Sequence, residues 1–181
     1  MLRSNFFEHE DGDQLKEEYE REASLLVALL VKFPEIGTLR VSPAEEILRI
    51  TYLLNQPPET QRLHEFQRRL GLSLAALTKL TGGEPRVARA DIESYDGLAP
   101  LHVTRSLRSV LYEEFEIITS EVRAHFDDAL IVDDGGRTPP WFETDDLHLA
   151  LTLEELRSPD AKTFIGFRDG GRVLVFNEPQ L

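Results

Sequence analysis

The first two-thirds of the chain carry apolar residues mostly at helical spacing. Between about residues 14 and 33, apolar side chains recur three and four positions apart, and Pro34 ends the pattern. The run Leu25–Val31 adds apolar positions outside this stripe. The pattern predicts a helix over 14–33 that is covered on more than one side, by the rest of the fold or by a second copy.

A capping box predicts the next helix. Glu45 follows Ser42 by three residues, and Pro43 lies at the position that starts a helix. We therefore expect a helix over 43–54, after a short strand over 38–41. Proline and glycine separate further helical patterns, which cover about 63–70, 73–81, 85–93 and 101–127.

After residue 128 the period becomes that of strands. The run 129–132 is short and apolar, and residues 146–152 (DLHLALT) alternate leucines with other residues. TFIGF and RVLVF flank a loop that contains Asp-Gly, which predicts a β-hairpin at the end of the chain.

These patterns predict an α+β fold. Its N-terminal two-thirds are mainly helical, with about five helices, and a small antiparallel sheet with the C-terminal hairpin follows. We expect residues 1–13 to be a disordered acidic tail, 14–128 a helical region, and 129–181 a small β region packed on the helices.

Charge is distributed unevenly along an acidic chain. The net charge of −13 argues against binding of nucleic acid or an anionic membrane over the whole surface. Residues 111–160 sum to −11, whereas residues 61–90 hold six basic and only two acidic residues. The basic residues are Arg62, Arg68, Arg69, Lys79, Arg86 and Arg89. A basic middle between acidic ends predicts contact with an acidic surface, either of another protein or of a second copy.

Composition excludes several classes of site. The chain has no cysteine, so it has no disulfide, no thiol nucleophile and no cysteine-ligated zinc. No apolar run approaches the ~20 residues that span a bilayer, and the acidic N-terminus lacks a signal-peptide pattern. We expect a cytoplasmic protein without membrane contact.

One segment invites comparison with a helix-turn-helix. Residues 61–93 combine basic charge with short helical patterns around Gly82, and Lys79, Arg86 and Arg89 are the candidate DNA contacts. However, Thr78, Gly83 and Asp91 fall where the motif needs small or apolar residues. A carboxylate buried without a partner would be costly. The motif is therefore degenerate, and a solvated basic face on helical packing is favoured.

A metal site has weak support. Glu114, Glu121, His125 and Asp128 share one stripe of the helix expected over 101–127. Carboxylates and an imidazole can hold a divalent cation, so Glu121, His125 and Asp128 are candidate ligands. No second helix offers a partner histidine, and a charged edge beside a buried face explains the stripe better. We expect no cofactor.

These observations favour a non-enzymatic cytoplasmic adaptor or regulatory protein that acts through protein–protein contact and self-associates. No phosphate-binding loop, nucleophile elbow or dinucleotide fingerprint occurs. Candidate partner-binding residues are Trp141 and Phe142, which follow two prolines, and Arg68 and Arg69. The alternative is a DNA-binding transcriptional regulator that uses residues 61–93.

Overall fold

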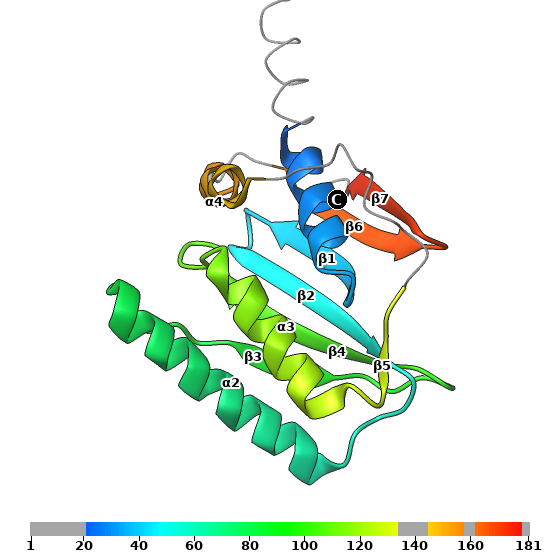
Figure 1. Cartoon of the computed structure of the whole chain (residues 1–181). Helices are drawn as coiled ribbons and strands as arrows, with labels where there is room; N and C mark the ends of the chain where they lie inside the picture. Colours follow the sequence, from blue (N-terminus) through cyan, green and yellow to red (C-terminus); the bar gives the residue numbers. More distant parts are fainter. Residues whose placement is uncertain (1–20, 134–144, 158–161, 179–181) are drawn as a thin grey trace, which may run out of the picture.

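The computed structural model describes residues 21–133, 145–157 and 162–178. Seven strands form one antiparallel sheet in the order β3-β4-β2-β1-β6-β7, and β5 pairs with the end of β2 (Figure 1). The strands are β1 (Ile36–Ser42), β2 (Ile47–Leu54), β3 (Arg89–Ile92), β4 (Ala99–Ser106), β5 (Leu130–Ile131), β6 (Phe164–Asp169) and β7 (Arg172–Asn177). The helices are an opening helix over 21–32, α2 (Thr60–Thr81), α3 (Glu113–Phe126) and α4 (Asp146–Glu155).

The predicted fold class is wrong in how it distributes the elements. Strands and helices are interleaved, and the sheet begins at Ile36 rather than after residue 128. The N-terminal two-thirds contain β1 to β4 and are not mainly helical. The segments with helical patterns form strands instead, because pairing with other segments of the chain outweighs the local preference.

A β-hairpin replaces the helix predicted over 43–54. Residues 43–46 form the turn between β1 and β2, and Glu46 adopts a left-handed φ of 56°. β2 buries Leu48, Ile50, Tyr52 and Leu54, every second residue, at the centre of the sheet. A helix cap contributes about 1 kcal/mol, whereas each such burial contributes about 1.5–3 kcal/mol. Tertiary burial therefore outweighs the capping box.

One long helix replaces the two short helices predicted over 63–81. α2 runs for 22 residues and buries Phe66, Leu70 and Leu74 on one stripe. Gly71 does not end it, and Ser73 does not cap a new helix, because the Ser73 hydroxyl donates to Glu121 at 2.6 Å. Residues 85–93, also predicted helical, contain β3.

Two further predictions are wrong for a similar reason. The helix expected over 101–127 divides into β4, which buries alternate side chains on one face, and the shorter α3. Residues 146–152 belong to α4, whose buried Leu149 and Leu153 are four residues apart. Alternate leucines therefore lie on a helix here.

Several local predictions are confirmed. The opening helix is helical over the described part of its range, and Pro34 follows its end. The expected strands over 38–41 and 129–132 correspond to β1 and β5. The terminal hairpin is β6–β7, and its two-residue turn places Gly170 and Gly171 at positive φ, as such turns require.

The described helices that contact the sheet pack on one face of it (Figure 1). Tyr52 of β2 bonds to Thr119 of α3, through hydroxyl groups 2.9 Å apart. Gly166 of β6 lies against the opening helix, since a Cβ there would come within 2.8 Å of Leu30. Ile50 of β2 and Gly166 both pair with Leu39 of β1, so Tyr52 and Gly166 point to the same face. The sheet core lies between this face and the helices.

Candidate functional site

The opposite side of the sheet, which we call the open face, carries the residues between the buried positions. Register defines two rows of side chains across it. The first row runs through Arg89, Thr104, Arg49, Arg40, Ile165 and Phe176, and the second through Asp91, His102, Thr51, Thr38, Phe167 and Leu174. Each row is therefore polar over β3, β4, β2 and β1 and apolar over β6 and β7.

Three arginines share the polar half of the first row. Arg40 and Arg49 are directly opposite each other on β1 and β2. Arg40 is compensated by Glu45 and Glu178, at 2.8 and 3.0 Å, and the Arg40 guanidinium lowers the pKa of the Glu45 carboxyl. Arg49 is exposed and has no ion-pair partner among the described residues. Arg89 lies 3.5 Å from Asp91 of the same face, so Arg49 is the one arginine of this row that no described carboxylate contacts, although Glu45 interacts with it electrostatically.

The apolar half consists of Ile165, Phe167, Leu174 and Phe176 on β6 and β7. The Phe167 and Phe176 rings stack with centroids 5.6 Å apart and an angle of 12°. Phe176 is 53% exposed. The other three side chains are half-buried. We call these four residues the apolar patch. A partly exposed apolar patch beside polar residues is typical of an interaction site.

A histidine on the open face has the neighbours of a proton relay. His102 Nδ1 lies 2.9 Å from the Thr51 hydroxyl, and His102 Nε2 lies 3.6 Å from Glu93. Thr51 is only 7% exposed, so a substrate does not reach its hydroxyl. Thr51 and His102 are directly opposite each other on β2 and β4. We interpret them as a cross-strand structural pair.

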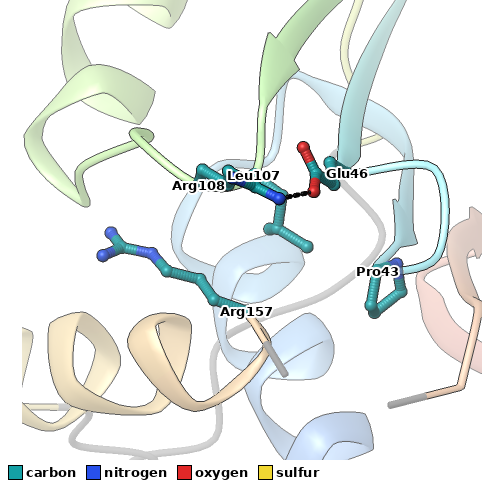
Figure 2. Close-up of a pocket in the computed structure, with 5 residues that line it drawn as sticks. All are labelled: Pro43, Glu46, Leu107, Arg108 and Arg157. Carbon is teal, nitrogen blue, oxygen red and sulfur yellow. Dashed lines mark hydrogen bonds and ion pairs between the residues drawn. The ribbon is translucent and has the colours of Figure 1, made fainter. Parts of the chain in front are cut away.

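A pocket of about 140 Å³ lies between the β1–β2 turn, the segment after β4 and the end of α4 (Figure 2). Glu46 pairs with Arg108, and Arg157 donates to the Val110 carbonyl at 2.9 Å. The charged groups that line the pocket therefore have partners within the chain. Small-molecule sites are commonly ~300–1,000 Å³. We assign no ligand to this pocket. It is lined by Pro43, Glu46, Leu107, Arg108 and Arg157.

A buried ionic cluster joins β4, α3 and the segment before β3. Arg105 donates to both Glu114 oxygens, at 2.5 and 3.1 Å, and Arg86 Nε lies 3.1 Å from the same carboxylate. These three side chains are at most 7% exposed. The Leu111 N–H also donates to Glu114, and Arg105 donates to the Val87 carbonyl, whereas Arg86 Nε contributes an ion pair without a hydrogen bond. Because the cluster is enclosed and internally paired, we interpret it as structural.

The structure does not bring the three metal candidates together around one point. Glu121 accepts from Ser73, and the His125 ring lies 2.8 Å from the Glu121 carbonyl and packs edge-on against Phe66. Asp128 pairs with Arg62 at 2.5 Å. Among the described residues, no group of three or more histidines and acids is arranged to hold a metal.

The degenerate helix-turn-helix that was considered as an alternative over 61–93 is not formed. Gly82 and Gly83, both at positive φ, follow α2, and the next element is a strand that pairs with β4. Arg86 is buried beside Glu114, Lys79 is exposed on the last turn of α2, and Arg89 is exposed on β3. Nucleic-acid binding by these residues stays a prediction, but the second helix that would enter a groove is missing.

The remaining candidates have different positions. Arg68 and Arg69 are exposed on α2, and Arg68 lies 3.9 Å from Glu65. Trp141 and Phe142 lie outside the described residues. Sequence reasoning missed the open face because its arginines come from three separated segments. The alternation of apolar and polar residues within β1, β2 and β4 was the local signal that could have indicated it.

Comparison with known proteins adds no family. No family model, curated protein or solved structure matches the chain. Within the described part, no helix combines the length and the apolar character needed to cross a membrane.

Proposed function

We propose that the protein is a non-enzymatic cytoplasmic adaptor whose open face docks an acidic, partly apolar segment of a partner protein. The observation that carries this proposal is the first row of the open face. In that row Arg89, Arg49 and Arg40 continue directly into Ile165 and Phe176. An extended segment that crosses the strands would meet guanidinium groups first and the apolar patch next.

The arginine pair supports an acidic occupant. Like charges directly opposite each other across two strands are destabilising. Glu45 and Glu178 both contact Arg40, whereas Arg49 interacts with Glu45 only through space, without an ion-pair contact. A carboxylate placed beside Arg49 would give its guanidinium a contacting partner, and hydrogen bonds between charged groups are among the stronger ones. The open face is therefore suited to a ligand that supplies negative charge at this point.

A protein segment fits better than a nucleic acid. The phosphate backbone of a nucleic acid would extend beyond the arginine row and over the rest of the surface. The chain has a net charge of −13, so it would repel those phosphates. Phe167 and Phe176 also stack on each other, so one face of each ring is already occupied. A short peptide needs only a few carboxylates and one or two apolar side chains.

Fluorescence anisotropy with defined peptides tests the proposal. The probe is a labelled peptide of alternating glutamate and phenylalanine, and the comparison is a peptide of alternating lysine and phenylalanine. We expect the acidic peptide alone to bind, more weakly at high salt. Arg49→Glu should weaken its binding about tenfold or more, since a charged contact contributes about 1.5–3 kcal/mol.

A matched charge reversal on α2 serves as the control. Lys79→Glu changes net charge equally but lies away from the open face, so it should leave peptide affinity within about twofold, allowing only for long-range electrostatics. Equal losses in the two variants would overturn the proposed site. Tighter binding of a single-stranded oligonucleotide than of the acidic peptide would overturn the proposed class of partner.

A further inference from the structure

The two edge strands of the sheet, β3 and β7, differ in whether their outward backbone groups have partners. At one edge, the outward Ala90 carbonyl of β3 accepts a hydrogen bond from Gln67 of α2, at 2.8 Å. At the other edge lies β7, and no described strand pairs with its outer side. β7 has six residues and four consecutive apolar ones, Val173 to Phe176. Proteins commonly cover, shorten or charge such an edge, because it offers free backbone groups to another chain.

The alternating direction of backbone N–H and C=O groups along β7 shows which of them point away from β6. The Glu178 N–H donates to the Thr163 carbonyl at 2.8 Å, so the N–H and C=O of Glu178 face β6. Along a strand these groups alternate in direction. The N–H and C=O groups of Val173, Val175 and Asn177 therefore point outward, away from β6.

We propose that a second copy of this chain pairs antiparallel with β7, with Val175 opposite the partner subunit's Val175. Val173 then lies opposite the partner subunit's Asn177, and all outward groups of both strands form ladder hydrogen bonds. In the same register Arg172 lies opposite the partner subunit's Glu178, once on each side of the twofold axis. This contact is independent of the docking proposed for the open face.

Charge and packing select this register. A slip of two residues places Arg172 beside the partner subunit's Phe176, or Leu174 beside the partner subunit's Glu178, and loses both charge pairs. A slip of one residue sets outward backbone groups against inward ones and breaks the ladder. Glu178 already accepts from Arg40, and a carboxylate has capacity for further donors.

The dimer would form one continuous sheet with all sheet-packing helices on the same face. Leu174 would contact the partner subunit's Phe176, so the two apolar patches would merge at the twofold axis. The arginines of each copy would lie outside this merged patch. The docking surface would then be repeated symmetrically, and a partner with two acidic segments could engage both copies.

Sedimentation equilibrium over a wide concentration range tests the dimer. We expect the full chain to be a dimer and Val175→Pro to be a monomer. Proline removes an outward N–H that the chain itself does not use, and edge strands tolerate proline at such positions. Lys79→Glu on α2 is the control and should remain dimeric. A wild-type chain that is monomeric throughout, or a folded Val175→Pro variant that dimerises as well as wild type, would overturn the proposal.

Single-cysteine variants test the register, because the chain has no cysteine of its own. Leu174→Cys and Phe176→Cys are purified separately and then mixed under oxidising conditions. Opposite residues in this non-hydrogen-bonded pair have Cα atoms ~4.5 Å apart, which suits a disulfide. We expect disulfide-linked dimers in the mixture and little in either variant alone. Equal linking of one variant with itself would overturn the register.

The docking proposal and the dimer proposal can be tested independently of each other. Arg49→Glu should reduce peptide binding and leave the dimer intact, since Arg49 lies on β2, away from β7. Val175→Pro should abolish the dimer and leave the arginine row unchanged. Loss of dimerisation in Arg49→Glu would contradict the assignment of dimerisation to the β7 edge.

Discussion

Glu114 is fully buried, and two arginines neutralise it. Arg105 and Arg86 lie within 3.1 Å of its carboxylate, and all three side chains are shielded from solvent. Taking an ion pair out of water is expensive, and the expense is offset only while every partner is present. The cluster therefore holds β4, α3 and the segment before β3 in one arrangement.

Glu114→Gln should destabilise the fold by about 3–5 kcal/mol, because it leaves two arginines buried without a counter-charge. Urea unfolding monitored by circular dichroism measures the change. The exposed neighbour Glu113→Gln is the control and should stay within about 0.5 kcal/mol of wild type. Similar unfolding midpoints for the two variants would contradict a structural role for the cluster.

At the scale of elements, α2 is the clearest departure from local signals. Gly71 and Ser73 suggest a break, yet the helix continues from Thr60 to Thr81. Its buried stripe of Phe66, Leu70 and Leu74 packs beside α3, and the Phe66 and Phe126 rings meet edge to face at 5.2 Å. This continuous contact outweighs the unfavourable helix propensity of one glycine, about 1 kcal/mol.

Gly71→Ala distinguishes a continuous α2 from two short helices. A Cβ at Gly71 meets nothing within 4 Å, so alanine should stabilise the protein by about 0.5–1 kcal/mol in thermal unfolding. If Gly71 instead ended a helix in the left-handed conformation, alanine would lower the melting temperature.

Contact between elements gives the opposite expectation at Gly166 of β6. A Cβ there would lie 2.8 Å from Leu30 and 3.4 Å from Leu26 of the opening helix. Gly166→Ala should therefore cost about 1–3 kcal/mol, as overpacked cores do. The same thermal scan measures it, and an unchanged melting temperature would show that the opening helix does not press on β6.

For the whole molecule, surface ion pairs link elements that are distant in sequence. Lys32 of the opening helix pairs with Asp146 of α4, and Arg62 of α2 pairs with Asp128 after α3. Each cation lowers the pKa of its carboxyl below the ordinary value of 3.8. In the folded state these groups therefore release protons more readily than in the unfolded chain.

Acid should weaken the fold through these pairs. Their contribution is complete above pH 3.8 and is lost as the pH falls through the lowered folded-state values, because the unfolded chain then binds more protons. Urea midpoints measured from neutral pH downward should fall less steeply at the acid end for Asp146→Asn than for wild type. The exposed Asp127→Asn is the control and should follow wild type.

Elements whose signals are local can be predicted from the amino-acid sequence alone. The opening helix ends at a proline, and the β6–β7 hairpin has the glycines that its turn requires. The basic excess of residues 61–90 was also evident, although Arg86 proved to be buried. Turn geometry and proline restriction act between neighbours, so they can be read without knowledge of the fold.

β2, β4, α4 and the open face instead depend on contacts between segments that are distant in the sequence. The capping box before β2 is a real local preference, but the strand gains more by burying alternate side chains between β1 and β4. Arg40, Arg49 and Arg89 come from three strands, and strand register alone sets them in one row. Register depends on pairing between distant segments, which no local pattern specifies.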